Sequence, residues 1–427
     1  MTLSDEQLFE ILDDWNYWNK KPKDLGIERS YIKTIESFLH LKEVIVIDGV
    51  RRSGKTTALR QLMNKTKANF LYINFDDYRL YSHYSINLLE RIINIYRQKV
   101  NPKDKAIIIF DEIQNINGWE KFIRTKYDLE ENLKFIVTGS NAALISKEFS
   151  SLLTGRIVRI NFFPFDFKEY LELKDIHAVS DSYQSLRHDK DIYINHFENY
   201  LQEGGFPEYL KKKEREILSN YFQDIISKDI VSRFNIRDKT TLDSMALDFA
   251  TNISNILNMK QTAKTLGVSL NTLKKYMSYL EQAKLFFYIK YFSYSVKSQN
   301  RMNRKIYMID NGIRNIVSFK FSRDLGKLAE NFVFLQLLRK GYTSYYWNKI
   351  NEVDFIAIKG DKKIAINVSY ASQLEEREYK GLIEFSKEHK INELIILSKD
   401  INETKIIEEK TIKIIPLWYF AINTEVG

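Results

Sequence analysis

Five short apolar runs recur between residues 43 and 163, and longer mixed stretches that can form helices separate them. The runs are EVIVIDG, FLYINFDD, AIIIFDE, KFIVTGS and IVRINFF. They are continuously apolar rather than alternating, which is typical of parallel strands that are buried on both faces and joined by helical crossovers. The pattern predicts a doubly wound α/β domain over residues 1–164, with a helical extension at its N-terminal side.

The pattern changes after this domain. Residues 165–258 have the spacing of amphipathic helices, interrupted by the breaker sequence GGFP. Residues 259–320 have the spacing of a helix-turn-helix followed by strands, which is the pattern of a winged helix. Residues 321–427 begin with a long helical stretch and continue with strand-like runs around EVDFIAI, KIAINVS, LIILS and IKIIPL. We therefore predict a helical lid or linker region, a winged helix and a second α/β domain.

The composition is that of an ordinary folded protein. The chain has 427 residues, of which 44% are hydrophobic and 28% charged, and it contains no cysteine. The lack of cysteine excludes disulfides, a thiolate nucleophile and cysteine-based metal sites. The first residues lack a basic segment followed by an apolar one, and no apolar run approaches the roughly 20 residues of a membrane span. We expect a soluble, cytoplasmic protein without a membrane partner.

The segment GVRRSGKT fits the phosphate-binding pattern GxxxxGK[S/T], and it lies between a strand-like run and a helix-forming stretch. In that setting backbone N–H groups face a phosphate, the lysine reaches the terminal phosphates, and the hydroxyl after it ligates Mg²⁺. We expect Thr56 to bind the metal ion as well as the nucleotide. The residues predicted to bind the nucleotide are Gly49, Arg52, Ser53, Gly54, Lys55, Thr56 and Thr57.

An acid pair ends the strand-like run AIIIF and supplies the second half of this site. We expect Asp111 to hold the metal shell and Glu112 to orient and deprotonate the attacking water, although two acids can also simply cap a helix. A later run, FIVTGSN, ends in Thr138, Ser140 and Asn141. Thr138 is the predicted sensor of the terminal phosphate or of the water, and ordinary turn chemistry is the alternative.

Arg156 stands just before the last strand-like run of the predicted core. A planar cation at this place could reach the γ-phosphate of a neighbouring subunit as charge develops in the transition state. This hypothesis implies a homo-oligomer. A surface salt bridge is the alternative interpretation.

The net charge of +9 is concentrated in one segment, because residues 259–305 contain ten basic residues and one acid. A solvated Lys-rich face is one interpretation and contact with DNA is the other. On the second helix of the helix-turn-helix and on the following wing, the candidate DNA contacts are Asn271, Thr272, Lys274, Lys275, Lys297, Arg301 and Arg304. Lysine and arginine suit phosphate contacts, whereas Asn271 and Thr272 could reach base edges. Packing against a protein partner is the alternative.

Together these motifs resemble those of the archaeal-type AAA+ ATPases found in archaea and bacteria. The resemblance extends from about Arg29 to about Ser398 and is carried by GVRRSGKTT, IIIFDEIQNINGWE, FIVTGSN, LLTGRIVRINFFPFDFKEYL, EGGFPEYL, KIYMIDNG and EVDF. It implies a P-loop AAA+ core that uses ATP and Mg²⁺, with a helical lid and a winged helix. It also implies a C-terminal α/β domain similar to PD-(D/E)XK restriction-type nucleases, in a family without a settled cellular role.

The resemblance places a nuclease site on Glu330, Asp354, Asn367 and Ser369. In working nucleases the position of Asn367 holds a metal-binding acid and that of Ser369 holds a lysine that assists the hydroxide nucleophile. An amide is a poorer Mg²⁺ ligand than a carboxylate, and serine carries no charge. Glu330, Glu352 and Asp354 remain, but we expect this domain to be inactive and to contact nucleic acid or protein.

The leading hypothesis is a Mg²⁺-dependent ATPase that couples hydrolysis to movement of a DNA-binding winged helix and an inactive nuclease-like domain. Such an enzyme would act in a DNA transaction, in mobile-element biology or in defence. The alternatives are a nucleotide-operated signalling switch that binds a protein partner, and an active metal-dependent nuclease with a rearranged site.

Overall fold

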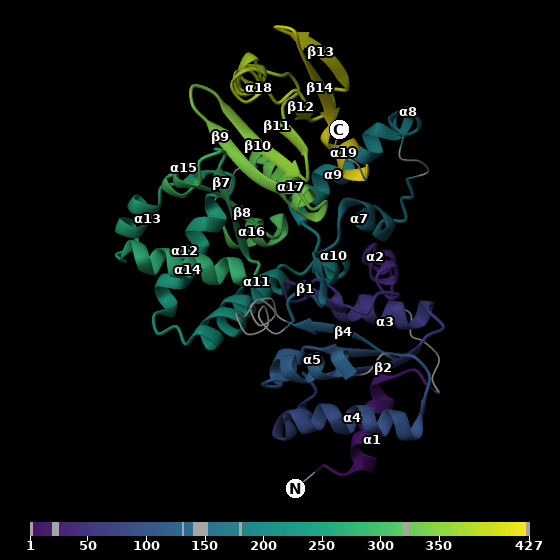
Figure 1. Ribbon diagram of the computed structural model, residues 1–427. Helices are drawn as coiled ribbons and strands as arrows, with labels where there is room; N and C mark the ends of the chain where they lie inside the picture. Colours follow the sequence, from purple (N-terminus) through teal and green to yellow (C-terminus); the bar gives the residue numbers. More distant parts are fainter. Residues whose placement is uncertain are drawn as a thin grey trace. The chain divides into compact units, whose positions relative to one another are not determined.

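The structure is a computed structural model that describes residues 3–18, 25–129, 132–139, 153–178, 182–318 and 324–423. The chain forms two compact units, Met1–Phe163 and Pro164–Gly427 (Figure 1). The finer division of residues 165–427 into three domains stays a prediction. In the described part of the chain, no helix is long and apolar enough to cross a membrane.

The first unit contains a five-stranded parallel sheet, which confirms the predicted α/β core. Its spatial order is β2-β3-β4-β1-β5. The strands are β1 (Val44–Gly49), β2 (Asn69–Asn74), β3 (Ala106–Asp111), β4 (Leu133–Gly139) and β5 (Ile157–Phe162). The helical elements are α1 (Asp5–Trp15), α2 (Tyr31–Ser37), α3 (Lys55–Lys65), η1 (Tyr78–His83), α4 (Ile86–Lys99), η2 (Ile113–Asn115) and α5 (Trp119–Leu129).

Both faces of this sheet are buried, as strand β1 illustrates. Val44 and Val46 belong to a core that includes residues of α1, α4 and α5, whereas Ile45 and Ile47 belong to a second core with residues of α2 and α3. Figure 1 shows α3 and α4 on opposite sides of the sheet. Because side chains alternate between the two faces of a strand, a continuously apolar strand supplies both cores.

The second unit contains a nine-stranded mixed sheet. In spatial order its strands are β13 (Glu403–Ile407), β14 (Lys410–Pro416), β12 (Leu394–Ser398), β11 (Lys362–Ser369), β10 (Glu352–Lys359), β9 (Thr343–Asn348), β7 (Phe286–Tyr291), β8 (Arg304–Met308) and β6 (Ile256–Leu257). Strand β7 pairs in parallel with β9 through Lys290 and Tyr345. The predicted winged helix and the predicted second α/β domain therefore share one sheet, which the hydrophobic pattern did not indicate.

Many helices of the second unit lie in the predicted helical stretches. The helices are α7 (Phe167–Leu173), α8 (Tyr183–Leu186), η3 (Arg187–Asp189), α9 (Lys190–Glu203), α10 (Pro207–Lys212), α11 (Arg215–Asp224), the π-helix η4 (Ile225–Ser232), α12 (Lys239–Thr251), α13 (Met259–Thr265), α14 (Leu270–Gln282), α15 (Val296–Arg301), α16 (Asn311–Val317), α17 (Leu325–Arg339), α18 (Glu376–His389) and α19 (Leu417–Ile422). Of these, α15, α16 and α19 were not predicted. Gly267, with φ +67°, lies in the turn between α13 and α14. Ser269 caps α14 by accepting a hydrogen bond from the N–H of Thr272 at 3.0 Å.

Two segments that carried the resemblance meet inside the second unit. Asp310 of KIYMIDNG is buried, and its carboxylate accepts a hydrogen bond of 2.7 Å from the N–H of Gly205 in EGGFPEYL. A Cβ on Gly204 would lie 2.3 Å from both Asp310 carboxylate oxygens, and one on Gly312 would lie 2.0 Å from the carbonyl oxygen of Glu203. Burial raises the pKa of Asp310 to about 6. Close packing and hydrogen bonding explain these residue types without any catalytic role.

Candidate functional site

The phosphate-binding segment lies between β1 and α3, where its backbone requires glycine. Gly54 has φ +99°, a conformation that side chains disfavour. A Cβ on Gly49 would lie 2.2 Å from the carbonyl oxygen of Phe162 in the neighbouring strand β5. Arg52 also adopts a positive φ of 67° within the loop and is exposed. The loop conformation therefore depends on both glycines of the motif.

Lys55 is buried at the start of α3, and its ammonium is held by the loop itself. Its Nζ donates to the carbonyl oxygen of Gly49 at 2.9 Å and to that of Val50 at 3.3 Å. Neutral carbonyls are weaker partners for an ammonium than a phosphate oxyanion. The lysine is therefore free to exchange these carbonyls for a phosphate. Of the other predicted residues of this segment, Ser53 is buried and Thr57 is half-buried.

Asp111, at the end of β3, collects the other polar side chains of the site. Its Oδ2 accepts hydrogen bonds from the hydroxyls of Thr56 at 2.6 Å and Tyr72 at 2.7 Å, and from the amide of Asn74 at 3.3 Å. Its Oδ1 accepts from the hydroxyl of Thr138 in β4. Asp111 is fully buried. All four donors are neutral, so these contacts leave the carboxylate charge uncompensated.

Burial raises the pKa of Asp111, and the neighbouring Glu112 carboxylate raises it further, whereas the hydrogen bonds from Thr138, Thr56 and Tyr72 lower it. Burial and the charge of Asp111 also raise the pKa of Tyr72 well above its usual value, which keeps its phenol protonated. A buried carboxylate of this kind attracts a cation. The oxygen atoms of Asp111 and Thr56 suit Mg²⁺.

Glu112 follows in a left-handed conformation, with φ 57°. Its N–H donates to the Thr138 hydroxyl oxygen at 3.1 Å, and its carboxylate accepts from the amide of Gln114 at 2.6 Å. A non-glycine residue in this conformation needs support from its surroundings, and Thr138 supplies some of it. Thr138 thus contacts both acids. Ser140 and Asn141 lie outside the described residues.

Sequence reasoning missed Tyr72, Asn74 and Gln114. A signal existed for Asn74, because the run FLYINFDD turns polar at the carboxyl end of its strand, and Asn74 lies in register with Asp111. Tyr72 lies within an apolar run, and Gln114 lies beyond the strand. Their contacts arise only from packing.

Arg29, also missed, supports the phosphate-binding loop. It is 1% exposed, and its Nη1 donates to the carbonyl oxygen of Ser53 at 2.6 Å. Its Nη2 donates to the carbonyl oxygen of Phe163 at 2.8 Å, and its guanidinium carbon lies 4.5 Å from the ring centroid of Phe162. Since arginine is rarely buried, nothing in the sequence distinguishes this residue.

Arg156 forms a surface ion pair, which was the alternative interpretation. Its Nε lies 3.3 Å from Oδ1 of Asp128, and 32% of its side chain is exposed. Its guanidinium carbon is 5.8 Å from the ring centroid of Tyr127. A role across a subunit boundary stays a prediction.

Five predicted DNA-contacting residues are exposed, namely Asn271, Lys274 and Lys275 on α14 and Lys297 and Arg301 on α15. Thr272 is half-buried, and its hydroxyl lies 2.9 Å from that of Ser269 at the start of α14. Arg304 is half-buried on β8. Lys284 and Lys305 are buried. The exposed charge is therefore smaller than the sequence count suggested, and the predicted wing contains the helix α15.

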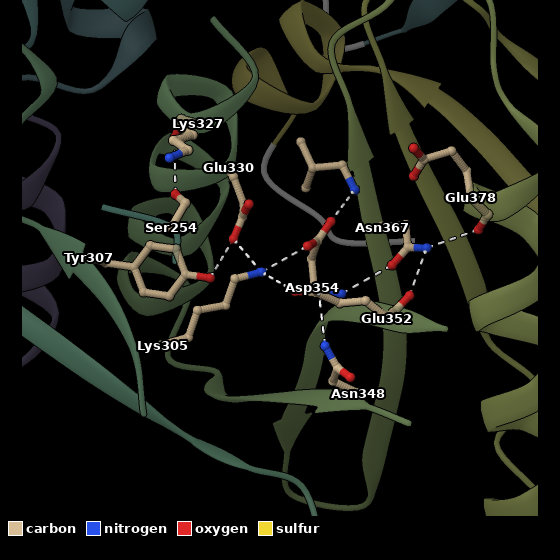
Figure 2. A network of polar contacts seen from close by, with 11 residues as sticks. Ser254, Lys305, Tyr307, Lys327, Glu330, Asn348, Glu352, Asp354, Asn367 and Glu378 are labelled. Carbon is tan, nitrogen blue, oxygen red and sulfur yellow. Dashed lines mark hydrogen bonds and ion pairs between the residues drawn. The ribbon is translucent and has the colours of Figure 1, made fainter. Parts of the chain in front are cut away.

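The candidate nuclease residues gather around one of these buried lysines (Figure 2). Nζ of Lys305 lies 2.8 Å from Oε1 of Glu330, 2.7 Å from Oε1 of Glu352 and 2.9 Å from Oδ1 of Asp354. The hydroxyl of Tyr307 donates to Oε1 of Glu330 at 2.7 Å. We call Lys305, Glu330, Glu352 and Asp354 the lysine cluster. In the sequence, Lys305 is distinguished only as one residue of the basic segment.

Burial and ion pairing compete in the lysine cluster. Burial disfavours the charged form of Lys305, but the Asp354 and Glu330 charges outweigh it and raise its pKa well above the usual value. Burial raises the pKa of Glu330 to about 8, although Lys305 lowers it. Lys305 therefore stays charged, and Glu330 is readily protonated.

Asn367 supports the cluster without contacting the ammonium. Its Oδ1 accepts from the N–H of Asp354 at 3.0 Å, and its Nδ2 donates to the carbonyl oxygen of Glu378 at 2.9 Å. Ser369 is buried at the end of β11. As the side chains lie in the described part of the chain, with Lys305 in place, no group of three His, Cys, Asp or Glu could hold a metal ion. The residues present do not fit the divalent ion of a working nuclease.

Comparison with known proteins assigns the first unit. Residues 41–171 match a family described as an AAA domain. The chain is 32% identical over 415 residues to the uncharacterized protein MJ1544 of Methanocaldococcus jannaschii, covering 92% of this chain and 91% of that protein. The chain belongs to the AAA+ ATPase family. An uncharacterized protein of Haemophilus influenzae is 30% identical over 393 residues, covering 88% of this chain and 94% of that protein.

Two further family matches of this AAA+ protein name no activity. Residues 194–324 and 325–420 match two domains of unknown function, DUF8612 and DUF4143. The structure of the Orc1 protein of Aeropyrum pernix in complex with DNA is similar at 13% identity over 73% of this chain and 95% of that one. Its TM-score of 0.31 is too low to carry an argument. The winged helix and the nuclease-like domain thus remain predictions.

Proposed function

We propose that this AAA+ protein is a Mg²⁺-dependent ATPase whose nucleotide cycle moves a DNA-binding winged helix and an inactive nuclease-like domain. One observation carries the ATPase part. Asp111 is buried among the neutral donors Thr56 and Thr138, and Thr56 directly follows the phosphate-binding loop after β1, which β4 separates from β3 in the sheet. Backbone N–H groups that bind anions and a carboxylate that attracts a cation are thereby combined.

Nucleotide binding would use the phosphate-binding loop and Lys55. The ammonium of Lys55 would leave the carbonyl oxygens of Gly49 and Val50 for the phosphate oxygens. Thr56 and Asp111 would hold Mg²⁺, which neutralises phosphate charge when bound. The hydrogen bond between these two residues already places both oxygens together.

Hydrolysis would use Glu112 as the base that takes a proton from the attacking water. Gln114 donates to the Glu112 carboxylate and would orient it, and Thr138 would keep both acids in place. Arg156 would act on the site of a neighbouring subunit in a homo-oligomer, after leaving its ion pair with Asp128.

DNA binding would use α14 and α15, where Lys274, Lys275, Lys297 and Arg301 are exposed. Their positive charge suits a phosphate backbone, and Asn271 suits a base edge. A cytoplasmic DNA transaction, mobile-element or defence process fits this partner. The same surface would suit an acidic protein if the chain is a signalling switch.

The first experiment measures ATP turnover with and without duplex DNA. We expect Mg²⁺-dependent turnover that DNA changes, and DNA affinity that falls steeply as salt rises. Turnover without any DNA response or DNA binding would favour the signalling switch. No turnover under either condition would contradict the ATPase proposal.

The second experiment tests the inactive state of the nuclease-like domain. We expect no DNA cleavage by the purified protein with Mg²⁺ or Mn²⁺, because the ammonium of Lys305 lies among the acids that would bind the ion. Cleavage that disappears in Asp354→Ala would instead establish the active-nuclease alternative.

A further inference from the structure

The lysine cluster joins three elements of the second unit through one buried ammonium. Lys305 lies on β8, Glu330 on α17, and Glu352 and Asp354 on β10. Only 2% of the Lys305 side chain is exposed. In the sheet, β7 and β9 lie between β8 and β10. Side-chain ion pairs therefore link two strands that share no backbone ladder, as Figure 2 shows.

The ammonium and the acids match in number. An ammonium has three N–H donors, and Lys305 has three carboxylate partners at 2.7–2.9 Å. The other oxygen of Asp354, Oδ2, accepts from the N–H of Val368 at 2.9 Å. The ammonium is thus fully hydrogen-bonded, and Asp354 is held from both sides.

A divalent ion would need the place that the ammonium takes. Mg²⁺ and Mn²⁺ prefer oxygen ligands, and Mg²⁺ binds them at about 2.1 Å. The three carboxylate oxygens that face Lys305 are such ligands, but they already surround its Nζ. The same oxygens cannot surround both cations, and the charge of the ammonium repels a second cation.

We infer that Lys305 is the resident cation of this site: its ammonium takes the place of a divalent ion and, with the three acids, fastens β8 to α17 and β10. The domain thereby keeps the cohesion that a metal ion would provide and excludes the metal itself. This inference rests on the proposed inactive nuclease-like domain, but it depends on neither ATP hydrolysis nor DNA binding.

The test compares thermal unfolding of the full chain in EDTA and in increasing Mn²⁺, without nucleotide. The variants are Lys305→Met, Asp354→Asn, the two changes combined, and the control Lys274→Met, which removes an exposed lysine. We expect Lys305→Met to lower Tm by about 10 °C in EDTA, because three acids lose their partner. We expect Mn²⁺ at a hundredfold excess over Kd to raise its Tm again by about 5 °C.

The wild type and Lys274→Met should show no Mn²⁺ effect on Tm that depends on Asp354, and the double variant should lose the rescue. Manganese bound by the wild type and lost in Asp354→Asn would overturn the inference. So would a Lys305→Met protein that unfolds at the wild-type temperature in EDTA and does not respond to Mn²⁺. Mn²⁺ that binds at the phosphate-binding loop does not affect the result, because the comparison uses only the part of the Tm shift that Asp354→Asn removes.

Two further variants complete the test, and the first of them covers poor folding. If Lys305→Met is not recovered folded, Lys305→Met with Glu330→Gln leaves one fewer buried acid without a partner, and failure of Mn²⁺ to raise its Tm would overturn the inference. Asn367→Glu adds an acid beside Asp354 but keeps the ammonium. We expect it to bind no Mn²⁺, and clear binding there would show that Lys305 does not occupy the metal position.

Discussion

Two aspartates of this protein, the buried Asp111 and the half-buried Asp354, differ in what balances their charge. Asp111 accepts hydrogen bonds from the neutral side chains of Thr56, Tyr72, Asn74 and Thr138. Asp354 instead lies 2.9 Å from a buried ammonium. A carboxylate with neutral donors keeps its attraction for an external cation, whereas one paired with an ammonium does not. The neighbours of an acid, rather than the acid itself, decide whether a site is open to metal.

The largest expected effect concerns the nucleotide site around Asp111. Lys55→Ala should abolish ATP binding, whereas Glu112→Gln should keep binding and lower turnover by about 10²–10⁴-fold, since it removes only the base. Binding of a fluorescent nucleotide and steady-state turnover measure the two effects. Lys65→Ala, at the far end of the same helix, is the control. Equal turnover in Glu112→Gln and wild type would remove Glu112 as the base.

The second effect tests whether the nucleotide site also receives a cation, Arg156, from a neighbouring subunit. Arg156→Ala should lower turnover about 100-fold or more, but only at protein concentrations where subunits assemble, because the finger acts on another subunit. Turnover and light scattering over a concentration series measure this. Arg124→Ala removes another cation near Asp128 and is the matched control. A monomeric wild type with full turnover rules out the role.

The third effect separates exposed lysines from the buried one. Lys274→Glu with Lys275→Glu should weaken DNA binding and make the plot of log affinity against log salt shallower by about 0.9 per lost phosphate contact. Fluorescence anisotropy at several salt concentrations measures this. Lys380→Glu, on α18, is the control. Unchanged affinity in the double variant would favour the protein-partner switch.

The smallest effect concerns how the lysine cluster makes the stability of the folded state depend on pH. The folded-state pKa of Glu330, about 8, lies above its ordinary value of 4.5. The folded state therefore binds the extra proton, and its stabilisation is present at low pH and lost as the pH rises from 4.5 toward 8. The slope is at most about 1.4 kcal/mol per pH unit.

Glu330→Gln should flatten this dependence in urea unfolding of the second unit between pH 5 and 8. Glu376→Gln, on the exposed start of α18, serves as the control. Identical pH slopes in wild type and Glu330→Gln would show that Glu330 does not titrate in this range.

Much of the first site could be predicted from local sequence. The phosphate-binding loop needs glycine at Gly54 for a reason that lies within one turn, its positive φ, and Asp111 ends a strand recognisable by its apolar run. Arg29 and Gln114 could not be predicted, because their roles come from partners that chain folding brings near. Residues whose roles depend on nearby parts of the chain could thus be predicted, whereas residues whose roles depend on distant partners could not.

By itself, the sequence was enough to predict the five parallel strands and the nucleotide motif, and to show Asn367 and Ser369 where the predicted nuclease site would need an acid and a lysine. Only the tertiary structure decided that Lys305 faces Glu330, Glu352 and Asp354 rather than DNA. A count of charges along the chain contains no information on distance. Hydrophobic periodicity indicates which face of a strand is buried, but the packing of α17 and β10 decides what covers that face.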